Sequence, residues 1–379
     1  MSVVTCIEDL RELAKKRVAR AIFDYVDCGS YSECTLRANR ADLESLALRQ
    51  RVGIDVDRRS TRASMIGHEV TMPVALAPTG LTGLNWADGE ILAARAAERF
   101  GVPFTLSTMS ICSIEDVADA VRKPFWFQLY VMRDRGFAAS LIERARAANC
   151  SALMLTLDLQ IQGQRHRDIK NGLAVPPRLT AATFWDILKK PGWALNVLRG
   201  KRKSFGNLEG RIPEGKNLTT LSQWIAGQFD PTLSWKDVEW VKKLWGGKLV
   251  VKGILDAEDA KIAAGVGVDA IVVSNHGGRQ LDGAISSIRA LPEIAEAVQG
   301  KTEVWVDGGI RSGQDVLRAL ALGADATMIG RAFLYGLGAM GEAGVTRALE
   351  IIRAELDVTM ALCGLRDVRE ASPAILRSA

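Results

Sequence analysis

Histidine is scarce in this chain, with three among 379 residues, so few side chains can exchange a proton near neutral pH. The cysteines form no CxxC pair and no metal-ligand spacing, which argues against a disulfide framework and a zinc site. No apolar run approaches the roughly 18 residues of a membrane span, and the N-terminus has no signal-peptide pattern. We therefore expect a cytoplasmic protein without a metal, either soluble or peripherally attached to a membrane.

The charge and the length of the chain further restrict the class of protein. The 49 basic and 44 acidic residues leave a net charge of +5, too small a surplus to indicate nucleic-acid binding. With 48% hydrophobic residues, the chain is long enough for a large core, and an α/β barrel fits this size.

Short apolar or β-branched runs alternate with segments of helical periodicity along most of the chain. Eight runs are predicted strands: 74–77, 104–106, 126–129, 153–156, 249–252, 271–273, 304–306 and 327–329. Eight βα units predict a (β/α)8 TIM barrel, an α/β fold, more often than an open sheet.

Two segments fall outside this repeat. Residues 1–72 are predicted to form an N-terminal helical cap over one mouth of the barrel, which then spans 73–379. A long insertion at about 168–234 follows the fourth strand and carries tryptophans among basic residues. This pattern is typical of an interfacial membrane segment, and equally of a lid helix packed on the barrel with a solvated basic rim.

The active site of a TIM barrel lies at the C-terminal ends of its strands, so the polar residues there should converge. His276 ends the sixth predicted strand, and Arg279 follows it. An imidazole can accept a proton, and a guanidinium binds a carboxylate through two hydrogen bonds. His68 lies in an extended link before the barrel and His166 among charged residues at the rim, so His276 is the expected base.

Asp158 and Lys252 end neighbouring strands and leave alternatives open. Asp158 would orient the imidazole of His276 or cap the next helix. Lys252 would face developing negative charge, form a Schiff base, or pair with an acid such as Asp158. Tyr130 and Gln128 alternate on one strand and therefore point the same way, and Tyr130 can donate to a substrate oxygen.

Glycines and arginines follow the last two strands, in the stretches 307–313 and 329–331. Backbone amides and guanidinium groups at this position of a barrel commonly hold a phosphate. A phosphorylated cofactor or substrate is therefore predicted.

The motifs Ser274-Asn275-His276-Gly277-Gly278-Arg279-Gln280, Ala77-Pro78-Thr79-Gly80, Phe127-Gln128-Leu129-Tyr130, Asp307-Gly308-Gly309-Ile310-Arg311 and Gly330-Arg331 resemble those of the FMN-dependent L-2-hydroxy acid dehydrogenases and oxidases. The resemblance covers nearly the whole chain. It is nearest to the bacterial membrane-associated L-lactate and mandelate dehydrogenases, because Gly80 stands where many oxidases carry alanine and because the insertion is basic and aromatic.

The resemblance implies a role for each matching residue. His276 becomes the base and Asp158 its partner; Arg279 and Arg165 bind the substrate carboxylate, and Tyr25 and Tyr130 bond the substrate. Lys252 would stabilise the charge of reduced FMN. The remaining implied cofactor residues are Ala77, Pro78, Thr79, Gly80, Ser107, Gln128, Thr156 and Ser274 around the flavin ring, and Asp307, Gly308, Gly309, Arg311, Gly330 and Arg331 at the ribityl chain and phosphate.

The implied reaction is oxidation of an L-2-hydroxy acid, L-lactate to pyruvate first, with electrons passed to a quinone or another respiratory acceptor. L-Mandelate, a broader set of acids, or an oxygen-using oxidase are the alternatives, and Met109 leaves the substrate size open. The resemblance also implies a homotetramer, peripheral on the inner face of the cell membrane. Outside this family, an aldolase or isomerase with Lys252 as nucleophile and a non-catalytic membrane adaptor are the competing hypotheses.

Overall fold

The computed structural model describes residues 3–173, 181–209 and 227–377. Its centre is a parallel eight-stranded sheet in the order β4-β11-β10-β9-β8-β7-β6-β5. A parallel bridge between Leu76 and Phe104 joins the two edge strands, so the sheet closes into a barrel. The strands are β4 (Val74–Leu76), β5 (Thr105–Ser107), β6 (Trp126–Leu129), β7 (Ala152–Thr156), β8 (Lys248–Ile254), β9 (Ala270–Val273), β10 (Glu303–Val306) and β11 (Ala326–Ile329). All eight predicted strands are confirmed.

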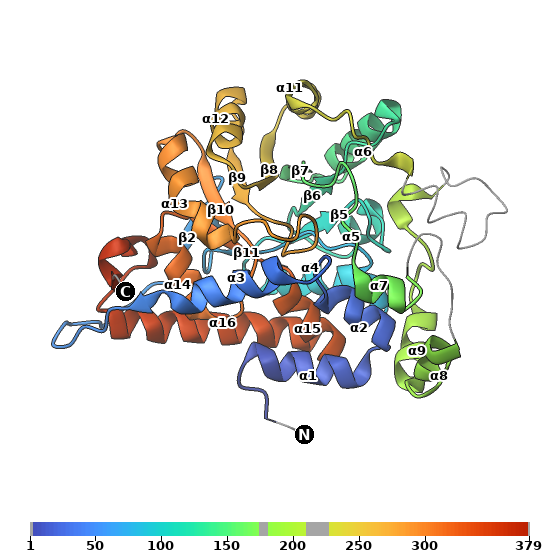
Figure 1. Ribbon diagram of the computed structural model, residues 1–379, viewed down its shortest axis with the longest axis horizontal. Helices are drawn as coiled ribbons and strands as arrows, with labels where there is room; N and C mark the ends of the chain where they lie inside the picture. Colours follow the sequence, from blue (N-terminus) through green and yellow to red (C-terminus); the bar gives the residue numbers. More distant parts are fainter. Residues whose placement is uncertain (1–2, 174–180, 210–226, 378–379) are drawn as a thin grey trace.

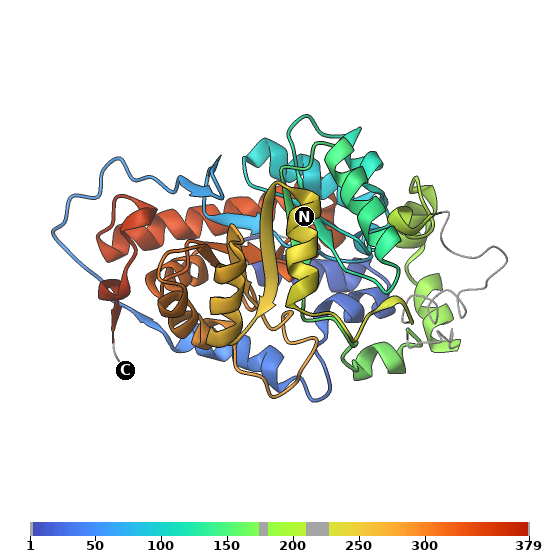
Figure 2. The same cartoon turned by 90° about the horizontal axis from the view of Figure 1, so that it is seen from above.

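Helices surround this barrel, as Figures 1 and 2 show. Several start at a side chain that accepts a hydrogen bond from the first turn, such as Ser113, Asp134 and Ser312. The outer helices are α4 (Gly89–Phe100), α5 (Ile114–Ala118), α6 (Arg135–Ala147), α11 (Trp235–Trp245), α12 (Ala257–Val266), α13 (Ser287–Val298), α14 (Gly313–Ala321), α15 (Arg331–Met340) and α16 (Glu342–Cys363).

The interior of the barrel is filled. Trp126 and Trp305 stack with ring centroids 5.2 Å apart, among fully buried residues of the other strands such as Met154, Val250 and Val272. Replacing either tryptophan by alanine would cost about 3–5 kcal/mol of folding free energy. This packed core fixes the strand ends on which the functional residues lie.

Residues before Pro73 cover both ends of the barrel, not one. Helices α1 (Ile7–Arg17), α2 (Arg20–Asp27) and α3 (Cys34–Ser45) form the predicted helical part. The strands β2 (Ala63–Met65) and β3 (His68–Val70) form an antiparallel hairpin, and Met65 packs against the barrel interior. The hairpin differs from the extended link expected there because Ile66 and Gly67 adopt positive φ angles, 44° and 85°, and reverse the chain.

The C-terminus returns to the cap. The short helices η3 (Val368–Glu370) and η4 (Pro373–Ile375) lead into β12 (Leu376–Arg377), which pairs antiparallel with β1 (Ala47–Leu48). The division at residues 72 and 73 remains a prediction.

The insertion after β7, the fourth barrel strand, is present as predicted. It contains α8 (Ala181–Leu188), α9 (Pro191–Arg199) and η2 (Gly206–Leu208), and α7 (His166–Lys170) overlaps its start. Residues 174–180 and 210–226 of the predicted insertion lie outside the described residues. In both views α8 and α9 project at the end of the long axis opposite the C-terminus (Figures 1 and 2).

Candidate active site

The C-terminal ends of the barrel strands bring His276 and Asp158 together. The Nδ1 atom of His276 lies 2.9 Å from Oδ1 of Asp158, and both side chains are mostly buried. His276 adopts a positive φ of 57°, a conformation that costs a non-glycine residue about 1–3 kcal/mol, and its amide donates to Oγ of Ser274 at 3.0 Å. The fold therefore holds this imidazole in one position at the mouth of the barrel.

Gly253 creates the space for Asp158. A Cβ atom at this residue would lie 2.7 Å from Cβ and Cγ of Asp158, and its φ of +104° lies where side chains rarely occur. The register of β8 against β9 shifts between Lys252 and Ile254, which is the mark of a β-bulge. A glycine bulge on β8 thus lets the carboxylate approach the imidazole.

Burial alone would raise the pKa of Asp158, but the charges of His276 and Lys252 and the hydrogen bond from His276 outweigh burial and lower it. Asp158 is therefore ionised at neutral pH. An ionised partner keeps the proton of the imidazole on Nδ1 and leaves Nε2 free to accept one.

Lys252 has a different partner from the acid considered in the sequence. Its ammonium lies 3.0 Å from Oδ2 of Asp307 and donates to Oγ of Ser274 at 2.8 Å. Burial would lower the pKa of Lys252, but the charges of Asp307 and Asp158 raise it. Lys252 is therefore a paired cation, not the neutral amine that Schiff-base chemistry requires.

Tyr25 of α2 brings the two predicted carboxylate-binding arginines together. The guanidinium carbons of Arg279 and Arg165 lie 4.8 Å and 5.4 Å from the centroid of the Tyr25 ring. Arg279 donates to the backbone carbonyls of Tyr25 and Cys28, at 2.5 Å and 3.0 Å. The cap thus places two cations and a phenol at the mouth beside His276.

Asp168 contacts a predicted site residue but is not itself among the residues predicted from the sequence. It is buried and accepts a hydrogen bond from Nε of Arg165 at 2.6 Å. The sequence does contain a signal for this ion pair: Arg165 and Asp168 are three residues apart, a spacing at which an acid and an arginine commonly pair on a helix.

Burial is the main cause of a raised pKa at Tyr130, and the negative charge of Asp158 adds to it. This phenol remains protonated and can donate a hydrogen bond. Its ring packs edge-on against Phe229 with centroids 5.8 Å apart. The amide of Tyr130 donates to Oγ1 of Thr108, so β5 and β6 fix it together.

Several buried polar atoms at the same mouth lack a partner among the described residues. They are Nε2 of Gln128, Oγ1 of Thr156, Oδ2 of Asp158 and Oδ1 of Asp307. Buried polar groups in folded proteins are nearly always hydrogen-bonded, so these atoms indicate a bound molecule with polar edges. Three of the four residues were predicted to hold FMN.

The loops after β9, β10 and β11 bring three arginines close together at this mouth. In the described part of the chain, Arg279, Arg311 and Arg331 donate to backbone carbonyls. Burial, together with the nearby cations Arg279 and Arg311, lowers the pKa of Arg331 to about 10. A bound phosphate would offset this repulsion. Arg331 also braces the cap through the carbonyls of Val26 and Cys28, and it donates to the carbonyl of Gly277 in the loop after β9.

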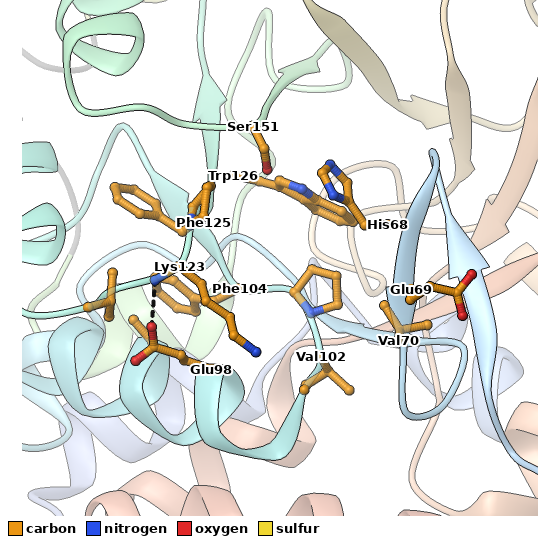
Figure 3. A pocket seen from close by; sticks show the side chains of 15 residues that line it. His68, Glu69, Val70, Glu98, Val102, Phe104, Lys123, Phe125, Trp126 and Ser151 are labelled. Atoms are coloured by element: carbon orange, nitrogen blue, oxygen red, sulfur yellow. Dashed lines mark hydrogen bonds between the residues drawn. The ribbon is translucent and has the colours of Figure 1, made fainter.

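The other two histidines lie elsewhere. His166 is exposed in α7 and meets the ring of Tyr31 edge-on. His68 lines a cavity of about 200 Å³ with Glu98, Lys123 and Trp126, shown in Figure 3. This cavity lies at the N-terminal ends of β5 and β6, opposite the mouth that holds His276. Within the described residues, the side-chain partner of His276 is Asp158 and not another histidine.

A model of the FMN-dependent dehydrogenases matches residues 14–378. The chain therefore belongs to this family, and FMN is its cofactor. The resemblance, the fold and the enzyme class inferred from the sequence are confirmed.

Relatives and solved structures agree with this membership. An L-lactate dehydrogenase of Caulobacter sp. (strain K31) is 48% identical over 379 residues, which is 99% of this chain and 98% of that protein. A structure described as monotopic membrane protein (S)-mandelate dehydrogenase has a TM-score of 0.94 and 36% identity, with 100% of both chains covered. A soluble mutant of the membrane-associated (S)-mandelate dehydrogenase from Pseudomonas putida has a TM-score of 0.86 and 37% identity, again over 100% of both.

Proposed function

We propose that this FMN-dependent dehydrogenase oxidises L-lactate to pyruvate. The observation that carries the proposal is the paired base, His276 with Asp158, beside Arg279, whose hydrogen bonds go to carbonyls and leave its charge for a substrate carboxylate. Similarity to an L-lactate dehydrogenase over the full chain supports lactate. L-Mandelate is the second candidate, supported by the mandelate dehydrogenase structure.

The unpartnered polar atoms and the group of arginines fit FMN, whose chemistry is the acceptance of two electrons. We assign the ring edge to Ser107, Gln128, Thr156 and Ser274, with the backbone of Ala77, Pro78, Thr79 and Gly80 beside it. Lys252 would hold its ammonium against negative charge on the reduced ring. The ribityl chain and phosphate would be held by Asp307, Gly308, Gly309, Arg311, Gly330 and Arg331.

The protein then needs to bind an acid and remove a proton. Arg279 and Arg165 would hold the carboxylate, while Tyr25 and Tyr130 would donate to substrate oxygens. With Nδ1 of His276 turned to Asp158, Nε2 takes the proton, and Asp158 stabilises the resulting imidazolium. Oxidation to the 2-oxo acid removes two protons and two electrons in all: His276 would take one proton, and the two electrons, together with the equivalent of the second proton, would pass to FMN.

The space for the substrate side chain lies near Gly80 and Met109. A Cβ atom at Gly80 would lie 3.3 Å from Cβ of Met109 and 3.6 Å from the Tyr25 hydroxyl. The flexible thioether of Met109 can adjust to more than one side chain, which supports some breadth of substrate.

The helices α8 and α9 support peripheral membrane contact. Trp185 is 62% and Leu198 is 68% exposed, and basic residues flank both helices. The inner side of α9 is fixed, because Trp193 donates to the carbonyl of Leu84 and Asn196 accepts from the amide of Ala87. Among the described residues, none of the helices combines the length and the apolar composition that a membrane span requires. We also propose that the enzyme passes its electrons to a quinone or another respiratory acceptor. It would lie on the inner face of the cell membrane and form a homotetramer.

The test is anaerobic bleaching of the flavin absorbance by L-lactate, L-mandelate, glycolate and D-lactate as the control. We expect L-lactate to bleach the flavin fastest and D-lactate not to bleach it. Faster bleaching by L-mandelate would reassign the substrate, and steady peroxide formation in air would make the enzyme an oxidase. Failure of L-lactate, L-mandelate and glycolate alike to bleach the flavin would contradict the proposed function.

A further inference from the structure

The last part of the insertion packs into the rim of the barrel, unlike α8 and α9. The helix η2 is buried, and the amide of Gly206 donates to the carbonyl of Ile111 at 3.0 Å. A Cβ atom at Gly206 would lie 2.6 Å from the amide nitrogen of Ser113 and 2.7 Å from the Ile111 oxygen. Only glycine allows this approach, so the segment is shaped to reach the rim.

Asn207 of η2 is fully buried and uses both ends of its amide. Its Oδ1 accepts from the amide of Ile114 at 2.9 Å. Its Nδ2 donates to Oγ of Ser110 at 3.0 Å and to the carbonyls of Ser107 and Thr108 at 3.2 Å and 3.4 Å. A single side chain thus binds both sides of the loop that follows β5.

The residues held by Asn207 reach directly into the candidate active site. The hydroxyl of Ser107 donates to Oε1 of Gln128 at 3.0 Å. The hydroxyl of Thr108 donates to the carbonyl of Gln128 at 2.7 Å and accepts from the amide of Tyr130 at 3.2 Å. One buried amide therefore fixes the backbone behind two ring-edge side chains and a substrate tyrosine.

Neighbouring charges hold η2 in place from outside. Nη1 of Arg144 donates to the carbonyl of Asn207 at 3.0 Å. Before η2, Arg202 and Lys201 both pair with the buried Asp116 of α5. The segment between α9 and η2 is thus attached to both α5 and α6.

We propose that Asn207 is a positioning residue for the flavin edge and for Tyr130, and that through it the insertion takes part in building the active site. The proposal rests on the proposed function for the roles of Ser107, Gln128 and Tyr130. Asn207 acts only through these residues and does not touch the substrate.

The experiment compares Asn207→Asp and Asn207→Ala in the full-length flavoprotein, with Glu209→Gln as the matched control on the exposed side of the same segment. Asn207→Asp keeps the acceptor for Ile114 but replaces the donor by an oxygen. We measure the visible flavin spectrum, the FMN dissociation constant, the midpoint potential, kcat, KM and the rate of anaerobic reduction.

Both variants should bind FMN about 10-fold more weakly, with a shifted visible spectrum and potential, because the ring edge loses its support. The reduction rate and kcat should fall by about 10–100-fold, with a smaller change in KM. Burial raises the pKa of a carboxyl at this position, so acid restores a donor. The rate of Asn207→Asp relative to wild type should therefore recover between pH 8 and pH 6. Glu209→Gln should match wild type throughout.

Spectrum, FMN affinity and potential at wild-type values in both variants, with only a lower Tm, would overturn the proposal. If Asn207→Ala does not fold, Asn207→Asp decides by its acid recovery, and a ratio that does not change with pH overturns it. If no hydroxy acid bleaches the flavin of the wild-type protein, the proposed function is contradicted, but the proposal for Asn207 is not. The flavin spectrum and the FMN affinity of the variants still test Asn207, because neither measurement needs a substrate.

Discussion

The loop after β9 and the helices α8 and α9 are built in opposite ways. In the loop after β9, Ser274, Asn275 and His276 are each hydrogen-bonded, and Asn275 exchanges two hydrogen bonds with Asn39 of the cap. In α8 and α9 no residue with a described side chain is buried. Large apolar residues there face solvent: Phe184, Trp185, Leu188, Leu195 and Leu198.

The difference assigns different tasks to the two regions. Proton transfer requires an imidazole held within a few tenths of an ångström, which only a fully bonded loop provides. Contact with a lipid surface requires exposed apolar area, and precise positioning of each side chain does not strengthen this contact. Changes in the two regions should therefore affect different measurements.

The largest effect is expected for His276→Gln. Glutamine cannot accept a proton near neutral pH, so kcat with L-lactate should fall by about 10⁴-fold while FMN remains bound. Steady-state kinetics with an artificial electron acceptor measure the loss. His166→Gln is the control, because His166 is exposed in α7 and should retain full activity. Retained turnover in His276→Gln would remove this residue from the role of base.

Asp158→Asn should have the next largest effect. The asparagine cannot stabilise an imidazolium, so kcat should fall by about 10²-fold, with little change in the unfolding midpoint. Because the pKa of Asp158 is lowered, the wild-type carboxylate stays ionised through the neutral range. If kcat of the variant equals that of wild type at every pH between 6 and 8, the carboxylate does not act on His276 and only caps a helix.

The triple variant Trp185→Ser, Leu195→Ser and Leu198→Ser tests the other region. Each buried apolar side chain contributes about 1.5–3 kcal/mol, so partition onto anionic vesicles at low salt should fall by at least about 10²-fold. Co-sedimentation with vesicles measures the change. The control is Val358→Ser with Leu362→Ser, two exposed apolar residues on α16. An equal loss in the control would mean that α8 and α9 have no special role.

The smallest effect is expected for Arg202→Met, which loosens the attachment of the segment after α9 to α5. Burial alone would raise the pKa of Asp116, but hydrogen bonds from Arg202 and Lys201 lower it below its usual 3.8. A lowered pKa stabilises the fold above the usual value, and this contribution is lost as the pH falls toward the folded-state pKa.

At pH 7 the free energy of unfolding of Arg202→Met should therefore be about 1–2 kcal/mol lower than that of wild type. The gap should close as the pH falls below about 4, as urea titrations at several pH values would show. Glu209→Gln removes only an exposed partner of Arg202 and should change little. A gap that is constant down to pH 3 would contradict the assignment to Asp116.

The barrel and the ring of polar strand ends could be predicted because both depend on local patterns. Apolar runs of the right length specify strands, and residues that follow parallel strands meet at one edge whatever the details of packing. For this reason the sequence alone predicts that His276, Asp158 and Lys252 lie together. The cofactor could be predicted because motifs spread over nearly the whole chain resemble those of FMN-dependent enzymes.

Contacts between distant segments could not be predicted in this way. The partner of Lys252 depends on the relative heights of β8 and β10, which a sequence pattern does not give. Asn207 lies in an irregular stretch with no periodicity, and its role follows only from the approach allowed by Gly206. The hairpin at 63–70 is held mainly by long-range packing against the barrel interior.

The most direct test of the separation between the two regions is anaerobic bleaching by L-lactate, measured in parallel for His276→Gln and for the triple variant in α8 and α9. Both proteins should carry FMN. We predict that the triple variant bleaches at the wild-type rate without binding vesicles, and that His276→Gln binds vesicles without bleaching. Bleaching at the wild-type rate in His276→Gln, or its loss in the triple variant, would contradict the account.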